Sequence, residues 1–553
     1  MKPPRLRGAA LVAARVAAEN PATGAVLRAA LEQSLGLDRL SALPASARGE
    51  TPLDALPLRA KSTEHALPAE ELPLPEPSAW PLGVRAYRAA FDAKKTDPVA
   101  VVERALARVQ ALADNRVLNI LASHDAKVAR REAEAAKERL REGKPRGPLD
   151  GVPYLLKDEL DAEGLPTGIG SRCEPTEPKL GDSAVVARLR AAGAIMVAKT
   201  VMTEWGMSPL GQNERSIMPH NALHAERVPG GSSTGSAVGV ALGVTPFAVG
   251  TDGGGSVRIP AALQGLFGIK PTFGRVSRDG DGLKGSVGHI GPIAASSVDL
   301  ALFLDAVSSE RDPRDPLTLP APPPPAGGFG ARLGAGVRGM RIGVPESEWA
   351  EADAVVAKHG RAALAELERR GAELVSVSIP LASVAAPVGY LTIGCEALAA
   401  QAAHWAERRH LMADDLRLSF AVLSRISAAD FLDAQRLRAS LRLDVARALR
   451  SVDVIAMPTT QTTAPPLPVG DRGRAFADTV AIDAMCRFCF LGNLTGLPAG
   501  TAPVGLDEEG LPAGLQIVGD AWDEHVVIGV LAELERSGIA QVPRPRAAFD
   551  PPF

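Results

Sequence analysis

Two glycine-framed serine clusters stand out in the chain. The first, PGGSSTGSAVG at 229–239, carries serines at positions 232, 233 and 236. Its G-x-S-x-G pentad would make Ser233 the nucleophile of an α/β-hydrolase. The second, GTDGGGSVRIP at 250–260, places Ser256 directly after three glycines. Either serine could attack a carbonyl carbon, so the surrounding sequence must decide between them.

The surroundings of Ser233 argue against a nucleophile elbow. An elbow needs a strand, a sharp turn and then a helix, whereas the segment before Ser233, IMPHNALHAERVPGG, is loop-like. A hydrolase of that kind also needs a histidine base, and none of the nine histidines has a glycine-framed or carboxylate-paired setting. His220 and His224 lie in a polar loop. Ser233 could instead cap the helix that follows it.

Ser256 has a more suitable setting. The apolar run TPFAVG at 245–250 predicts a strand that leads into the turn 252–256, DGGGS. Successive glycines leave backbone N–H groups bare on one side, which suits the binding of an oxyanion formed beside the serine. A purely structural turn or an anion-binding nest would have the same sequence pattern.

Lys157 is a candidate general base. It ends the apolar run of LDGVPYLLKDEL, where burial disfavours the charged form of a lysine. Ser–Lys arrangements are an established variant of the histidine-based triad. The alternative is a lysine that merely ends a buried strand.

Together these motifs resemble the amidase signature family. They read GPLDGVPYLLKD, PGGSSTGSAVGVALG and GTDGGGSVRIPAALQGLFGIKPTFGRVS, in the family's order and spacing. The likeness continues through GDSAVVARLRAAGAIMVAKTVMTEWG, GHIGPIAASSVDLALFLDAV and FLGNLTGLPAGTAPVGLDEEGLPAGLQIVGDAWDE. It covers about residues 82 to 540 and leaves the N-terminal segment outside.

The resemblance implies a Ser–cis-Ser–Lys triad. By position, Ser256 corresponds to the nucleophile, Ser232 to the bridging serine with a cis peptide before it, and Lys157 to the base. In the implied mechanism, neutral Lys157 takes a proton from Ser232 while Ser232 takes that of Ser256, which attacks the amide carbonyl. The relay then protonates the leaving amine, and water hydrolyses the acyl-enzyme.

The resemblance also assigns the neighbouring residues. The oxyanion hole is expected to consist of the backbone N–H groups of Gly253, Gly254, Gly255 and Ser256, with Ser233, Asp252 and Arg258 as supporting residues and Ser236 as a helix residue. One position departs from the family pattern, since Thr234 stands where the family usually has glycine. That change could alter the local backbone, but the three triad positions are intact.

The rest of the chain predicts elements that could position these residues. Five short runs, apolar on both faces, are strand candidates: 194–199, 245–250, 340–345, 452–458 and 513–519. Because helical patterns alternate with them, we expect an α/β fold with a large mixed, mostly parallel central β-sheet sandwiched by α-helices. Two helices are predicted most clearly, one after Asp97 as its N-cap and one in the charged run 125–143.

The chain divides into two parts by composition. Residues 1–80 read as an N-terminal helical appendage and Pro-rich connector, and residues 81–545 as the catalytic domain with a surface excursion at about 310–335. The appendage is expected to be dispensable for the chemistry, because every motif lies beyond it.

Composition limits the other function classes. A net charge of -3 over 553 residues argues against a nucleic-acid partner. Four cysteines do not form a disulfide framework and suggest a cytoplasmic location, with Cys486 and Cys489 as buried core thiols. No metal or cofactor is expected, since no ligand cluster is evident. Arg15 interrupts a signal-like N-terminus, and no run reaches the ~20 apolar residues of a membrane span.

The sequence therefore predicts an amidase that hydrolyses a small-molecule carboxylic amide to an acid and an amine or ammonia through a Ser256 acyl-enzyme. The alternative within the family is the amidase component of a tRNA-dependent amidotransferase. An inactive scaffold with the same fold is a third interpretation, which the intact triad disfavours. The amide itself and a homodimeric assembly stay open.

Overall fold

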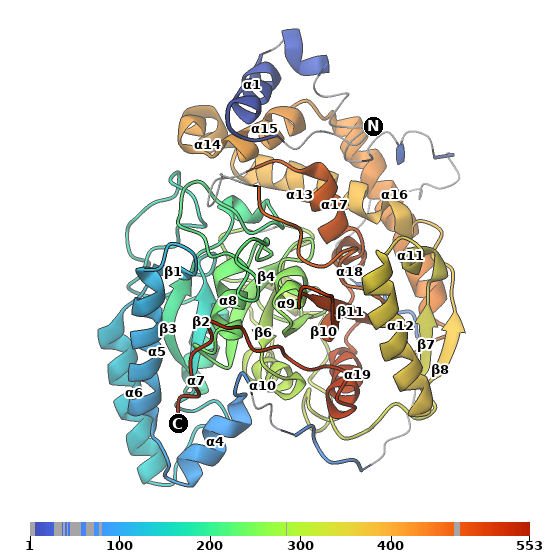
Figure 1. The fold of residues 1–553 in the computed structure, drawn as a ribbon. Helices are drawn as coiled ribbons and strands as arrows, with labels where there is room; N and C mark the ends of the chain where they lie inside the picture. Colours follow the sequence, from blue (N-terminus) through green and yellow to red (C-terminus); the bar gives the residue numbers. More distant parts are fainter. Residues whose placement is uncertain are drawn as a thin grey trace.

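The computed structural model describes residues 6–20, 22–26, 36, 39–40, 43–44, 57–61, 71–76, 80–283, 285–468 and 476–553. Within them, eleven strands form one sheet in the order β1-β3-β2-β4-β6-β5-β10-β11-β9-β7-β8 (Figure 1). The strands are β1 Leu121–Ser123, β2 Pro153–Lys157, β3 Ile195–Thr200, β4 Phe247–Asp252, β5 Phe267–Lys270, β6 His289–Ala294, β7 Arg341–Val344, β8 Glu373–Ser376, β9 Val454–Pro458, β10 Ala499–Leu506 and β11 Pro512–Gly519. The five predicted strands correspond to β3, β4, β7, β9 and β11 and are confirmed.

The strand pairing is mixed, as expected, but it is not mostly parallel. Four of the ten ladders are parallel, β2 with β3 and β4, and β7 with β8 and β9. The ladders from β4 through β6, β5, β10 and β11 to β9 are antiparallel. Parallel neighbours need a long crossover, whereas β10 and β11 are joined by a tight turn in which Asp507 N–H donates to Leu511 O. The predicted predominance of parallel pairing is wrong for this reason.

Helices cover both faces of the sheet. The α-helices are α1 Gly8–Glu19, α4 Val84–Asp92, α5 Pro98–Ala113, α6 Ala126–Arg141, α7 Ala184–Ala191, α8 Thr234–Ala241, α9 Arg258–Leu263, α10 Ser297–Val307, α11 Glu346–Trp349, α12 Ala354–Arg369, α13 Ala385–Ala400, α14 Ala402–Glu407, α15 Asp414–Leu423, α16 Ala428–Leu449, α17 Thr479–Cys486, α18 Cys489–Thr495 and α19 Glu524–Arg536. In β2, Tyr154 and Leu156 pack into the core shared with α7, α10 and α19. Leu155 packs into the opposite core with α5, α6 and α8. The α/β sandwich is therefore confirmed.

The two clearest helix predictions are confirmed. Asp97 caps α5 by accepting a hydrogen bond from Ala100 N–H at 2.9 Å. Asp125 caps α6 in the same way through Lys127 and Val128, and the chain leaves the helix at Gly143 with φ of 69°.

Helices α13 to α17 form a group beyond the edge of the sheet, with α1 lying against α15 (Figure 1). Arg15 of α1 pairs with Asp414 at 3.0 Å, and Arg417 pairs with Glu19 at 2.7 Å. Part of the predicted Pro-rich connector, at 67–70 and 77–79, lies outside the described residues. Within the region predicted as a surface excursion, Pro316–Thr318 forms a 3-10 turn, and Phe329 is fully buried.

Among the described residues, one helical stretch, Ala382–Ala400, is long and apolar enough to cross a membrane by length and composition. The sequence patterns alone predicted no such run. More than half of the stretch is buried inside the protein. Val388 and Leu391 pack with the core of α16 and α18, which accounts for the apolar composition.

Candidate active site

The site lies where two parallel neighbouring strands end. Lys157 is the last residue of β2, and β4 ends at Asp252, directly before the glycine turn. The register pairs Leu156 with Val249, so both strand ends lie at the same edge of the sheet. The segment before α8 brings Ser232 to this edge. The structure thus gathers the three sequence-predicted triad residues from three separate motifs.

Lys157 contacts the proposed bridging serine directly. Its Nζ lies 2.8 Å from Ser232 Oγ, and the lysine side chain is fully buried. The Gly231–Ser232 peptide is cis, as the resemblance implied. Thr251 Oγ1 also contacts Lys157 Nζ, and Glu159 Oε2 lies 2.9 Å from it.

Ser256 lies at the junction of two cavities, both of which it lines, and is 8% exposed. Ser232 lines one of them with it. No hydrogen bond joins the two serines in the described part of the chain. The backbone carbonyl of Ser256 accepts from Ser233 N–H at 3.3 Å, which ties the two serine segments together.

The predicted oxyanion hole needs one correction. Gly255 donates its N–H to Asp252 Oδ1 at 2.8 Å, so this group is already occupied. For Gly253, Gly254 and Ser256, no acceptor of the backbone N–H lies among the described residues. These three are the remaining candidate donors, because an N–H group must be unpaired to receive an oxyanion.

Asp252 and Arg258 form the base of the glycine turn. Arg258 Nη2 lies 2.8 Å from Asp252 Oδ1 and Nε lies 2.9 Å from Oδ2, with both side chains fully buried. Burial by itself would raise the pKa of the Asp252 carboxyl. The Arg258 charge and hydrogen bonds from Arg258 and Asn493 outweigh it and hold that pKa well below its usual range. The Asp252 carboxylate and the Arg258 guanidinium thus form an ion pair at the base of the turn that carries Ser256.

The other serines of the first cluster have structural contacts. Ser233 is the N-cap residue of α8, yet its Oγ bonds to the backbone of Thr251 rather than to the helix. Ser236 lies within α8 and donates to Val249 O at 3.2 Å. Thr234, the departure from the family pattern, is the first residue of α8 and is fully buried. A helical position accepts any L residue, so threonine needs no backbone change there.

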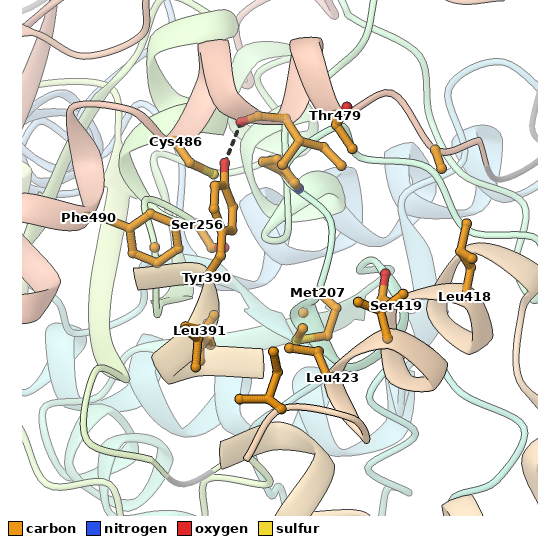
Figure 2. A pocket seen from close by; sticks show the side chains of 18 residues that line it. Met207, Ser256, Tyr390, Leu391, Leu418, Ser419, Leu423, Thr479, Cys486 and Phe490 are labelled. Carbon is orange, nitrogen blue, oxygen red and sulfur yellow. Dashed lines mark hydrogen bonds between the residues drawn. The ribbon is translucent and has the colours of Figure 1, made fainter. Parts of the chain in front are cut away.

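One cavity beside Ser256 is apolar and has a volume of about 140 Å³. Figure 2 shows Tyr390, Leu391, Leu423 and Phe490 around it. Tyr390 Oη donates to Ile482 O at 2.9 Å, which turns its polar atom away into the backbone of α17. No charged side chain lines this cavity among the described residues. Sequence reasoning missed these residues, because helices of ordinary apolar composition carry no local signal for a substrate pocket.

The other cavity, of about 60 Å³, has several ionisable side chains in a mixed lining, and for these we call it the polar cavity. Besides Ser232 and Ser256 it is lined by Glu159, Asp281, His289 and Glu396, none of which the sequence singled out. Burial and the nearby charge of Lys270 lower the pKa of His289 well below its usual range, so this imidazole is neutral. Its Nδ1 lies 2.8 Å from Val287 O. Glu159 could have been found from the sequence, because it lies two residues after the candidate base Lys157.

The cysteine pair belongs to the core. Cys486 and Cys489 are both buried and unbonded to each other, as predicted. Cys489 Sγ lies 3.3 Å from Thr459 O. Among the described residues, no group of three or more His, Cys, Asp or Glu side chains has an arrangement that could hold a metal ion.

Comparison with known proteins identifies the family of the chain. The amidase family profile matches residues 100–528. The chain is 37% identical over 492 residues to a subunit of the glutamyl-tRNA(Gln) amidotransferase of Anaeromyxobacter sp. (strain K), covering 84% of this chain and 97% of that protein. It is 33% identical over 525 residues to the fatty acid amide hydrolase of Arabidopsis thaliana, covering 90% and 83%. The native peptide amidase from Stenotrophomonas maltophilia superposes with a TM-score of 0.68 at 27% identity, covering 84% of this chain and 99% of that chain.

The chain is therefore an enzyme that hydrolyses amide C–N bonds, built on a mixed sheet covered by helices. More narrowly, it belongs to the amidase signature family.

Proposed function

We propose that the enzyme hydrolyses a carboxylic amide through an acyl-enzyme on Ser256, with Ser232 as the bridging serine and Lys157 as the general base. The observation that carries the proposal is the 2.8 Å contact between Lys157 Nζ and Ser232 Oγ, beside a cavity that Ser232 and Ser256 both line. A buried amine at this distance from a hydroxyl can accept its proton without intervening water.

Each step conserves protons. The Ser256 proton passes to Ser232 as the Ser232 proton passes to Lys157, and Ser256 Oγ forms a bond to the carbonyl carbon. Backbone N–H groups of Gly253, Gly254 and Ser256 receive the oxyanion. As the C–N bond breaks, the proton returns from Lys157 through Ser232 to the leaving nitrogen. Water then releases the acid by the same relay.

The position of Ser232 supports an orientation for the substrate. The leaving nitrogen receives its proton from Ser232, so the amine must lie in the polar cavity that Ser232 lines. The acyl group then occupies the apolar cavity on the other side of Ser256. We therefore propose that the acid half of the substrate is apolar and the amine half small.

The same cavity disfavours the amidotransferase alternative. Glutamine carries an ammonium and a carboxylate on its acyl half, which would need charged partners. The described lining of the apolar cavity offers none. Similarity to a glutamyl-tRNA(Gln) amidotransferase keeps this alternative in the test: the pure chain should release ammonia from glutamine far more slowly than it hydrolyses apolar amides.

The test of the catalytic assignment is labelling with a fluorophosphonate. Intact-mass analysis should show one adduct, which peptide fragmentation places on Ser256, and Ser256→Ala should abolish both labelling and turnover. Ser233→Ala is the matched control, since the Ser233 hydroxyl bonds to the backbone of Thr251 in β4 and to no other group among the described residues. An adduct on Ser233 would instead revive the elbow hypothesis. A panel of amides with graded acyl chains, assayed on pure protein, tests the substrate assignment.

A further inference from the structure

Lys157 Nζ is surrounded by three oxygen atoms. Besides Ser232 Oγ at 2.8 Å and Thr251 Oγ1, Glu159 Oε2 lies 2.9 Å away. Thr251 Oγ1 in turn donates to Glu159 Oε2 at 2.6 Å. The lysine side chain is 0% and the glutamate side chain 5% exposed, so solvent screens this contact little. A buried carboxylate thus touches the proposed base directly.

A second carboxyl group, that of Asp281, lies beside Glu159. Burial, and then the adjacent Glu159 charge, raise the pKa of Asp281 well above its usual range despite the nearby Arg278. Asp281 thus holds its proton more firmly than a free carboxyl does, and it lines the same cavity as Glu159. The backbone fixes this pairing, because Gly282 N–H donates to Glu159 O at 3.0 Å and Leu160 forms a bridge with Asp281. The two carboxyl groups therefore lie together, with Glu159 in contact with Lys157.

The proposed reaction creates a charge where this carboxylate lies. When Ser256 attacks, Lys157 receives a proton and becomes an ammonium group inside the protein. An uncompensated buried cation is costly, whereas one in contact with a hydrogen-bonded carboxylate is stabilised. Glu159 supplies that counter-charge without moving, since its other partners, Thr251 and Asp281, already orient it.

We propose that Glu159, held by Asp281, is a positioning residue for Lys157: it aims Nζ at Ser232 and stabilises the ammonium formed as Ser256 attacks. This inference rests on the proposed function. It places a pair of buried acidic residues beside the three-residue relay, and this pair takes no part in the proton transfer.

The other charged groups around the pair have separate partners. Arg278 Nη1 donates to Gly285 O and Gly288 O, and Glu396 accepts from Ser286 N–H and Oγ. His289 of β6 is neutral, because burial lowers its pKa. Of the carboxylates lining the polar cavity, Glu159 is the one within ion-pair distance of Lys157 among the described residues.

The test measures the pH dependence of kcat/KM in Glu159→Gln. We expect kcat/KM to fall about tenfold or more through kcat rather than KM. The reason is that Glu159 stabilises the Lys157 ammonium, which forms only as Ser256 attacks. The acid limb should also move to lower pH, since removing a carboxylate disfavours the protonated lysine. Glu159→Asp keeps the charge and should restore part of both effects. Glu163→Gln removes the same charge from an exposed neighbouring position and should match the wild type.

An acid limb at the wild-type pH in Glu159→Gln, with a rate within about twofold, would overturn the proposal. If that variant does not fold, the same profile on Glu159→Asp decides, because its shorter side chain recedes from Nζ and should shift the limb in the same direction by less. No shift there would also overturn it. The wild-type fluorophosphonate adduct on Ser256 tests the proposed function separately, since it does not depend on Glu159.

Discussion

Arg258 meets Asp252 through two parallel contacts of 2.8 and 2.9 Å, and neither side chain is exposed to solvent. The remaining nitrogen and oxygen atoms bond to Asn493, Gln516 and the backbone of the turn. Because this buried ion pair is also hydrogen-bonded on both sides, it fixes the loop that carries Ser256. The loop is therefore sensitive to the loss of either charge.

Replacing Arg258 by methionine should lower the free energy of unfolding by about 3–5 kcal/mol, because Asp252 is left as an uncompensated buried charge. Urea unfolding measures this loss. Arg130→Met is the control, since it breaks a pair whose side chains are 52% and 44% exposed and should lower stability far less. Equal losses in the two variants would mean that the buried pair contributes no more than a surface pair.

Asp299 makes stability depend on pH. Burial raises the pKa of Asp299 to about 7, and its Oδ1 accepts from Val84 N–H at 2.9 Å. A carboxyl with a raised folded pKa contributes stability that is complete below its unfolded value of about 3.9 and is lost as pH rises toward about 7. Asp299→Asn keeps the acceptor without the charge.

We therefore expect the free energy of unfolding of Asp299→Asn, relative to that of the wild type, to rise by on the order of 1–3 kcal/mol between pH 4 and pH 7. Above that range the difference should stay constant. Thermal unfolding midpoints at pH 5, 6, 7 and 8 measure the difference. Burial also raises the pKa of Asp415 to about 7, so only the difference between the two proteins isolates Asp299. A constant difference across the series would contradict the assignment.

Lys157→Ala should reduce kcat by a factor on the order of 10² or more, the usual effect of losing a general base. Steady-state kinetics on a small amide measure it. Lys179→Ala removes a lysine that is 40% exposed and should leave the rate unchanged. Near-normal turnover without Lys157 would mean that it merely ends a buried strand, and would direct attention to His289, which lines the polar cavity with Ser232 and Ser256.

Leu423→Trp should shift the acyl preference toward short chains, because its side chain faces the apolar cavity (Figure 2). We expect kcat/KM for a long-chain amide to fall about tenfold or more relative to a short-chain amide. The ratio of the two substrates is the readout, and Leu432→Trp at a position 48% exposed is the control. An unchanged ratio would place the acyl group elsewhere.

A chain that begins at Pro81 should still turn over a small amide, since the three triad positions lie beyond it. Its KM for long acyl chains should rise, however. Leu11 and Ala18 of α1 pack on Leu418 and Ala421 of α15, the helix whose other side chains line the apolar cavity. Comparing the two substrates in one preparation measures this. Loss of turnover on the small amide in a folded truncated protein would show that the N-terminal part shapes the reacting atoms.

Much of the fold and the three triad positions could be predicted from the sequence, because their signals are local. β4 and the glycine turn are contiguous in the chain, and Lys157 ends its own apolar run. The strand candidates were apolar on both faces, which marks a sheet covered by helices. Their pairing direction has no such local mark, since it depends on which connections carry a helix.

The residues that complete the site could not be predicted in this way. Asp281 acts on Glu159 from a loop more than a hundred positions later. Tyr390 and Phe490 line the cavity beside Ser256 from helices far downstream in the chain. Gly255 was assigned to the oxyanion hole because its neighbours are glycines, yet the carboxylate of Asp252 occupies its N–H. Contacts of this kind arise from tertiary packing, so no motif or residue spacing in the sequence indicates them.

The partners of Arg258 also set an order of events during synthesis. Its guanidinium bonds to Cys489 O, Asn493 and Gln516, all more than two hundred residues downstream. While the ribosome is still translating that region, the nascent chain already contains Lys157, Ser232 and Ser256 but lacks these hydrogen-bond acceptors for the Arg258 guanidinium. An unfinished polypeptide therefore cannot bury this arginine at low cost, and the hydrolase becomes competent only when its C-terminal segments have emerged and docked.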